Sequence, residues 1–305
     1  MAGTEPGIRP GAGGHLSAER RWAALGRELR APVGFVRAWF GRFSTHRMPM
    51  LAAALGFYFL LAFFPFLLFL VAVVSLVPGA QGTTDWLLGT AASHVPAEAW
   101  SLVEGAIRGI LATPRSGLVS LGVVLALWSA SAGFVSFMDC MNVAWGVREQ
   151  RPWWRTRLEA LGLTIGLSLF IVLAFVLTLF AGPLATLVAG WLGPAGAVAT
   201  LLINWTLSIV LVAFVTSVLY HVCPSVPGLR WQWLSPGAVV FTLGFASASA
   251  AFSIWVARFG SYDKTYGSLG APIVLLFWLY LLAVFLLLGG ELNAVLDERS
   301  AAARP

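Results

Sequence analysis

A single stretch of 70 residues, 160–229, contains no Asp, Glu, Lys or Arg. A soluble domain carries about 25% charged residues, so its water-exposed surface does not tolerate a stretch of this kind. Further charge-free windows lie at 48–84, 116–138, 231–257 and 265–290. Of all 305 residues, 59% are hydrophobic and 10% are charged. The composition therefore predicts an all-α protein that crosses a membrane several times.

The lengths of these windows set the number of spans. The hydrocarbon core of a bilayer is about 30 Å thick, and a helix needs about 20 apolar residues to cross it. We divide the longest window in two, at the Gly-Pro pairs 182–183 and 193–194, because proline cannot continue a helix. The result is a bundle of six transmembrane helices plus interfacial amphipathic helices. The expected spans are about 50–77, 116–145, 158–189, 196–221, 235–257 and 270–294.

The membrane domain is expected to cover residues 33–296. Residues 1–32 are predicted to be a disordered, basic N-terminus, and 297–305 a short tail. Residues 33–43 have the pattern of a basic amphipathic helix on the inner leaflet. Its predicted apolar face consists of Val33, Val36, Phe40 and Phe43. The one long external loop, at about 78–115, carries a second amphipathic repeat.

Loop charges orient the six spans. Fifteen of the 19 Lys and Arg residues lie in the N-terminal segment, the loops at 146–157 and 222–235, and the C-terminal tail. Only four lie on the other side. Cytoplasmic loops are enriched in Lys and Arg, so we expect both termini in the cytoplasm. Because topology accounts for the basic excess, we do not expect nucleic acid binding.

Polar residues cluster near the inner ends of two spans. Asp139 and Asn142 are three residues apart and are predicted to share a helix face. Glu291 and Asn293 occupy a similar depth in span six. Ionisable residues inside spans usually face the bundle interior and mark a pathway. The alternative is that the two acids lie near the headgroups, pair with arginines and only fix the packing.

Span one carries a proline near its middle. Pro65 should kink the helix and free a backbone carbonyl, and Tyr58 lies about two turns earlier. A kink beside a buried tyrosine would shape a gate or cavity, although kinks also occur in packed bundles. Small residues four apart should let helices approach closely. These pairs are Ala52 with Gly56, Gly162 with Gly166, and Ser247 with Ala251.

Motifs of soluble catalysis are missing. The sequence has no GxxxxGK[ST] phosphate loop, no HExxH and no paired carboxylates in any one stretch. The two cysteines, Cys140 and Cys223, have no CxxC partner. We therefore expect no enzyme, no metal site and no cofactor.

Three blocks of sequence resemble the YihY/BrkB family. They are AAALGFYFLLAFFPFLLFL in span one, YHVCPSVPGLRWQWLSPG from Tyr220, and YGSLG…WLY…LLGGELNA from Tyr266. Asn142 and Gly146 match the family's Asn-x-x-[Tyr/Trp]-Gly element. The third block opens on an external turn that contains Tyr266, Gly267 and Gly270. The similarity covers about residues 35–296.

The resemblance implies a six-span protein of the bacterial inner membrane without an established biochemical activity. Members of the family have been labelled virulence or serum-resistance factors, and formerly, by mistake, ribonuclease BN. Transport of a lipid or amphiphile is the commonest conjecture for the family.

Two functions remain open from the sequence. The first is a transporter or exporter of an amphipathic, lipid-like or anionic compound, with membrane lipids around it. The residues expected to line its pathway are Asp139, Asn142, Glu291, Asn293, Tyr58 and Pro65. Transport without a phosphate loop would be passive or ion-coupled, with Glu291 as the proton carrier. The alternative is a structural or envelope-integrity membrane protein that transports nothing.

Overall fold

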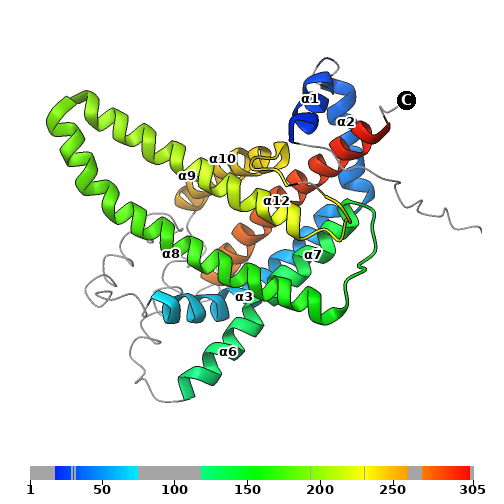
Figure 1. Ribbon diagram of the computed structural model, residues 1–305, viewed down its shortest axis with the longest axis horizontal. Coiled ribbons are helices and arrows are strands. Elements are labelled where there is room, and N and C mark those ends of the chain that lie inside the picture. Colours follow the sequence, from blue (N-terminus) through cyan, green and yellow to red (C-terminus); the bar gives the residue numbers. More distant parts are fainter. Residues whose placement is uncertain are drawn as a thin grey trace, which may run out of the picture.

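The computed structural model describes residues 18–28, 30, 32–74, 118–192, 194–229, 231–259 and 270–302, some of them by backbone alone. All regular structure in these ranges is α-helix (Figure 1), and six of the helices are long and apolar enough to cross a membrane. The predicted all-α bundle of six spans is therefore confirmed. The helices are α1 (Ala18–Glu28), α2 (Pro32–Thr45), α3 (Met48–Val74), α6 (Leu118–Ala130), α7 (Ala132–Ala144), α8 (Trp153–Leu192), α9 (Pro194–Val222), α10 (Pro236–Phe259) and α12 (Gly270–Ala302).

The second span consists of two helices, α6 and α7, rather than one. Only Ser131 separates them, and its amide still donates to the carbonyl of Leu127 at 3.0 Å. The Ser131 hydroxyl donates to the carbonyl of Trp128 at 2.7 Å. The guanidinium of Arg157 in α8 also donates to this carbonyl and lies 4.0 Å from the centroid of the Trp128 ring. The junction is thus fastened by a side chain from the next span.

The third and fourth spans form a long hairpin, α8–α9. Helix α8 has 40 residues and continues through the Gly182-Pro183 pair, and α9 begins at Pro194 of the second pair. At 1.5 Å per residue α8 is about 60 Å long, about twice the thickness of the hydrocarbon core. It must therefore tilt strongly or extend beyond the core. In Figure 1 the hairpin reaches away from the other helices.

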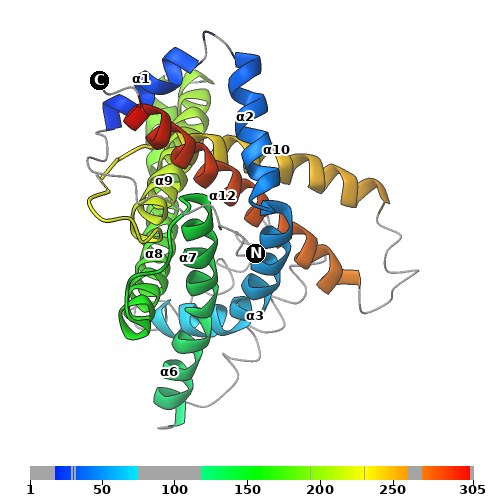
Figure 2. The same cartoon turned by 90° about the vertical axis from the view of Figure 1, so that its right-hand side faces the viewer.

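Helix α3 continues through Pro65 but changes direction. Its first, blue part and its last, cyan part run differently in both Figure 1 and Figure 2. Pro65 is the only proline inside this part of the helix, and proline removes a helix hydrogen bond and crowds the preceding turn. The expected kink in span one is therefore present.

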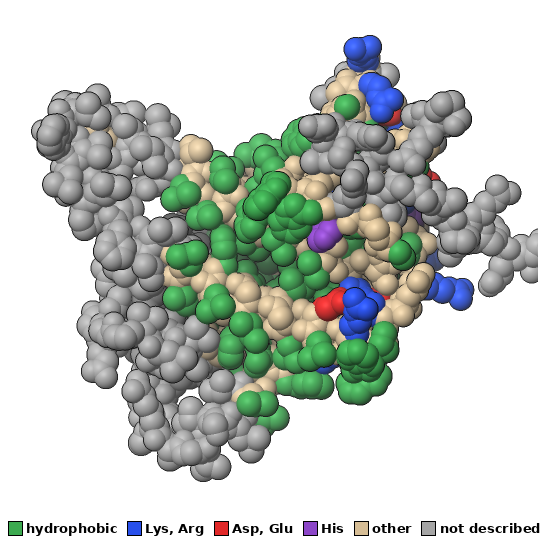
Figure 3. All heavy atoms as spheres, in the orientation of Figure 1, with side chains coloured by type: hydrophobic (Ala, Val, Ile, Leu, Met, Phe, Trp, Pro, Cys, Tyr) green, Lys and Arg blue, Asp and Glu red, His purple; other side chains and the backbone are tan. Residues whose placement is uncertain are grey.

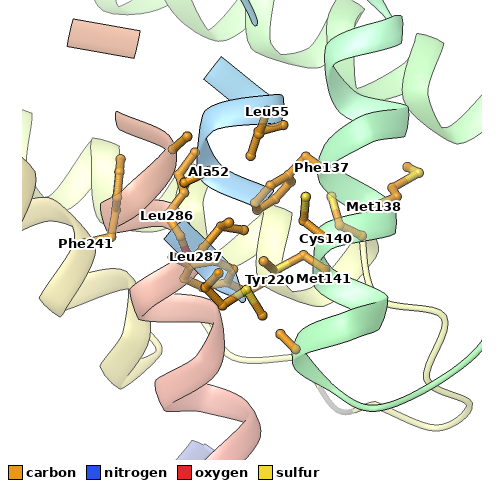
Figure 4. Packing of buried hydrophobic residues seen from close by; sticks show 14 of the residues in the cluster. Ala52, Leu55, Phe137, Met138, Cys140, Met141, Tyr220, Phe241, Leu286 and Leu287 are labelled. Carbon is orange, nitrogen blue, oxygen red and sulfur yellow. Dashed lines mark hydrogen bonds between the residues drawn. The ribbon is translucent and has the colours of Figure 1, made fainter. Parts of the chain in front are cut away.

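Helix α12 is the centre of the bundle and contacts α1, α2, α3, α7 and α10. The largest buried cluster forms where it meets α3, α7, α9 and α10 (Figure 4). Close approach depends on glycine: a Cβ on Gly56 of α3 would lie 3.1 Å from the Cα of Tyr280 in α12. The predicted close face of Ala52 and Gly56 is thus confirmed, since both residues are buried.

The other two predicted small-residue faces are wrong. Gly162 and Gly166 of α8 are exposed, and a Cβ on either would meet nothing within 4 Å. Ser247 and Ala251 of α10 are exposed as well. Small residues permit a close approach, but a neighbouring helix must be present to use it.

Of the four residues in the predicted apolar face of α2, only Phe43 packs into the protein. Phe43 is buried together with Phe35, whereas Val33, Val36 and Phe40 are exposed. The helix is therefore apolar on two sides, one against the protein and one away from it. The sequence pattern merged these two sides into a single face.

Candidate functional site at the basic end of the bundle

Several helix ends meet in one region, which we call the basic end. It comprises α1, α2, the C-terminal ends of α7, α9 and α12, and the N-terminal end of α10. Contacts between distant segments hold it together: the indole of Trp22 in α1 donates to the carbonyl of Leu234 at 3.1 Å. The indole of Trp39 in α2 donates to the carbonyl of Leu288 in α12 at 3.2 Å.

Glu291 of α12 is completely buried at the basic end, and each of its carboxylate oxygens has a partner. Oε2 accepts a hydrogen bond from Nε of Arg42 at 3.1 Å, and Oε1 pairs with Nδ1 of His46. Both partners come from α2 and the turn after it. A buried carboxylate without compensation is strongly disfavoured, so these two bases are what allow an acid at this position.

Arg42 joins three elements at once. Besides Glu291, its guanidinium donates to the carbonyl of Ala144 at 3.0 Å and pairs with Glu298. Ala144 is the last residue of α7, where free carbonyls and the helix dipole favour a positive charge. Arg42 therefore ties α2 to the end of α7 and to α12.

Asn293, also completely buried, fixes the start of α10. Its Oδ1 accepts from the amide of Gly237 at 2.9 Å, and its Nδ2 donates to Oγ of Ser235 at 3.1 Å. Ser235 in turn accepts from the amide of Ala238 at 3.2 Å, as a helix N-cap does. The polar atoms of Asn293 are thus used in capping a neighbouring helix.

The blocks of sequence that carried the family resemblance meet at this place. The hydroxyl of Tyr220 in α9 donates to the carbonyl of Leu286 in α12 at 2.7 Å. A Cβ on Gly290 would lie 2.8 Å from the side chain of Met141 in α7, and a Cβ on Gly289 would collide with Gly237 and Tyr220. The Gly-Gly pair before Glu291 is therefore required by close packing (Figure 4 shows Tyr220 and Met141 side by side).

Asn142 organises the loop between α7 and α8. It is buried, its Nδ2 donates to Glu149 at 2.8 Å, and its Oδ1 accepts from the amide of Ser225 at 2.7 Å. Arg151 donates to Glu149 and to the carbonyls of Val222 and Cys223, at 3.0 and 2.8 Å, and also pairs with Glu159. This network ties the hairpin to the end of α7.

The hydrogen bonds in this loop network shift the pKa values of Glu149 and Arg151. The hydrogen bonds from Arg151 lower the pKa of Glu149 to about 2, against the opposing effect of partial burial. Hydrogen bonds to Glu149 raise the pKa of Arg151. Burial raises the pKa of the Cys223 thiol, so this cysteine remains an unreactive thiol.

The other predicted pathway residues are not part of this cluster. Asp139 is exposed, unlike Asn142 on the next turn, and forms no hydrogen bond or ion pair with another described residue. Tyr58 is 45% exposed and Pro65 half-buried, both along α3 and away from Glu291. Of the predicted external turn, Gly270 is the buried first residue of α12, and Tyr266 and Gly267 lie outside the described residues.

Sequence reasoning missed the partners of the predicted residues. Arg42 was assigned only to an interfacial helix, and His46, Glu149 and Arg151 received no role. Arg42 and Glu291 are 249 residues apart in the chain, and no periodic pattern connects them. One signal was available: an acid within a span requires a base, and His46 and Arg47 directly precede span one.

The fold and the buried ionic site together define an all-helical, multi-pass membrane protein. The family model described as Virulence factor BrkB matches residues 39–305, and the chain belongs to this family. No solved structure matches the chain.

Several curated proteins are similar to the chain over most of its length. The YfkH protein of Bacillus subtilis, whose name calls it ribonuclease-like, is 35% identical over 88% of this chain and 96% of its own. A UPF0761 membrane protein of Chromohalobacter salexigens is 32% identical over 93% of this chain and 67% of its own. One of Tolumonas auensis is 27% identical over 86% of this chain and 85% of its own. Within the described ranges, no group of three or more His, Cys, Asp or Glu residues could hold a metal ion.

Proposed function

We propose that this protein moves an amphipathic or anionic compound across the bacterial inner membrane, through a cleft beside the α8–α9 hairpin. One observation carries this proposal. All six residues from Trp205 to Val210 in α9 are exposed. Six residues cover more than one helical turn of about 3.6 residues, so side chains on every side of α9 are exposed at this level.

The other end of the same helix is firmly packed. Thr216, Ser217 and Tyr220 are buried, and Cys223 just after the helix is buried too. The hairpin is therefore attached at the basic end and separated from its neighbours further along. Figure 3 shows hydrophobic side chains around a hollow on the face crossed by α8 and α9. A hollow beside apolar side chains suits a molecule with an apolar body.

The packed end of the hairpin lies at the basic end of the bundle. There Glu291 and its two bases form a buried ionic contact, which we call the charged lock. Glu291 holds Arg42 and His46 at the basic end, while Asn142 and Arg151 hold the foot of the hairpin. In the proposed cycle this end opens when the contacts of Glu291 are released, and Glu291 carries the proton if transport is coupled. Titratable groups inside spans commonly serve such relays.

The loops that meet at the basic end also support an orientation. They belong to the face that carries 15 of the 19 Lys and Arg residues. We place this face, with both termini, in the cytoplasm, because positive charge is retained on that side.

Native mass spectrometry of the purified protein tests the proposal. The wild type should retain an amphiphile, and the double variant Trp205→Gln/Ile209→Gln should lose about tenfold in bound fraction, which corresponds to roughly 1.4 kcal/mol. The control is Val124→Gln/Leu125→Gln, which changes two exposed residues of α6 at another edge of the molecule. Bare wild-type protein, or equal retention in both double variants, would overturn the proposal.

A structural role in the envelope is the second candidate. The specific observation in its favour is that the polar groups of Asn142, Glu291 and Asn293 are all engaged in buried contacts that join helices. Spin labels at Ile209 and Leu243, in a background without Cys140 and Cys223, separate the two candidates. A distance distribution that shifts when lipid extract is added favours transport. One narrow, unchanging distance favours the structural role.

A further inference from the structure

Helix α2 carries an apolar stripe that the protein does not cover. Val33, Val36 and Phe40 are 80%, 44% and 50% exposed, and their spacing of three and four residues places them along one side. The opposite side packs on α12 through Phe35 and Trp39. The packed side already gives the helix a place in the fold, so the stripe requires a separate explanation.

The stripe lies among unbalanced positive charges. Arg30 and Arg37 are exposed, and neither forms an ion pair with an acid among the described residues. By contrast, the inward-facing Arg21 and Arg42 are paired with Asp297 and Glu291. The outer surface of α2 thus offers apolar side chains next to guanidinium groups that are free to bind an anion.

Exposed aromatic rings lie at the same end of the bundle, on α1 and on the segment before α10. Trp22 of α1 is partly exposed while its indole bonds to Leu234, and Trp233 beside it is highly exposed. Tryptophan is enriched at the level of lipid headgroups, where its ring is apolar and its N–H can be hydrated. Exposed tryptophans at this end of the bundle are typical of a surface that meets lipid headgroups.

We propose that the stripe of Val33, Val36 and Phe40, together with Arg30 and Arg37, binds the anionic lipid leaflet and thereby holds Arg42 and His46 against Glu291. An anionic leaflet supplies both acyl chains for the stripe and phosphates for the guanidinium groups. A second copy of this chain would present the same positive charge and be repelled. This inference does not depend on transport, because it concerns only what holds Arg42 and His46 in contact with Glu291.

The same short helix connects the two contacts. Phe40 and Arg42 are two residues apart on different sides of α2, and His46 follows directly after its end. The indole of Trp39 fixes the middle of the helix to Leu288. A 14-residue helix is rigid over its length of about 21 Å, so lipid that holds the outer side also restrains Arg42.

Hydrogen exchange of the full chain in nanodiscs tests this inference. Amide exchange is followed in α2 and in residues 288–298, in discs of phosphatidylcholine alone and in discs that also contain phosphatidylglycerol. Each arginine near an anionic surface contributes about 1 kcal/mol, so two should slow exchange of α2 by up to roughly 30-fold in the anionic discs. Residues 288–298 should slow in parallel.

Two double variants distinguish lipid binding from general damage. Arg30→Gln/Arg37→Gln should lose the response to anionic lipid, while Arg30→Lys/Arg37→Lys should keep it and thereby show an intact fold. Equal exchange of wild-type α2 in both discs would overturn the lipid contact, as would a Gln variant that responds like the wild type. A response of α2 without one in residues 288–298 would overturn the link to Glu291.

Discussion

Arg42 and Glu291, 249 residues apart in the chain, form an ion pair in which Nε lies 3.1 Å from Oε2 and the carboxylate is completely buried. This pair joins the segment before the first span to the last span. The two bases of the charged lock, Arg42 and His46, are four residues apart in the chain, and both contact the carboxylate of Glu291. The ion pair therefore fixes the position of α2 against α12.

Arg42→Ala should destabilise the protein by about 3–5 kcal/mol, because it leaves a buried carboxylate with one base fewer and exposes the end of α7. Thermal unfolding in detergent measures this change. Arg37→Ala removes an exposed, unpaired arginine from the same helix and should change stability by less than about 0.5 kcal/mol. Adding Glu291→Gln to Arg42→Ala should restore part of the loss; a fully additive double variant would disprove the coupling.

Asn293→Ala should cost about 1–3 kcal/mol, because the buried amide of Gly237 loses its acceptor and the hydroxyl of Ser235 loses one of its two donors. The midpoint of unfolding in denaturant reports the loss. Ser247→Ala is the matched control, since among the described residues that exposed hydroxyl bonds only to the carbonyl of Leu243 in its own helix. Equal effects of the two substitutions would contradict the capping role of Asn293.

A pair of Gly→Ala substitutions tests the packing of α12. Gly289→Ala should destabilise the protein by about 1–3 kcal/mol or more, because its Cβ meets the backbone of Gly237, which cannot move aside easily. Gly166→Ala meets nothing within 4 Å and should be neutral or stabilising by up to about 1 kcal/mol. A tolerant Gly289 would show that α10 and α12 do not approach as closely as described.

Acid should weaken the loop at the foot of the hairpin through Glu149. The pKa of its carboxyl falls from an ordinary 4.5 to about 2 in the fold, so its contribution to stability is complete above pH 4.5 and is lost as the pH falls toward 2. Thermal unfolding of the wild type and Glu149→Gln across this range measures it. Their difference should be largest at pH 6 and vanish near pH 2; a constant difference would refute the assignment.

Glu291→Gln keeps the size of the side chain and removes its titration. If Glu291 carries the proton, proteoliposomes with the variant should move the co-purified amphiphile without the pH dependence of the wild type. Fluorescence-detected uptake across an imposed pH gradient measures this. Unchanged pH dependence in the variant would remove Glu291 from the coupling step.

The spans could be predicted from the sequence because their signal is local. An apolar run of sufficient length forms a helix in a membrane whatever its neighbours are, since its backbone must bond internally. The same reasoning located Glu291, Asn293 and Asn142, because buried polar groups stand out in an apolar run. It also correctly expected the bend at Pro65.

The arrangement of faces could not be predicted, because it depends on which helices become neighbours. Asp139 and Asn142 are three residues apart, yet only Asn142 faces the protein, since the loop that holds Glu149 and Ser225 lies on its side. Gly162 and Gly166 have the spacing of a contact face without a helix beside them. No periodic pattern in a single sequence connects residues as far apart as Arg42 and Glu291.

The central place of α12 has a consequence for how the protein is made. Ribosomes deliver the spans in order, and α12 is the last of the six described, although α1, α2, α3, α7 and α10 all pack on it. Until it enters the bilayer, Arg42 and Tyr220 have no acceptor in α12 and the glycines of α3 and α10 face no partner. The earlier spans therefore lack these contacts until the final one enters, and a chain interrupted before Gly270 should be degraded more readily by membrane proteases.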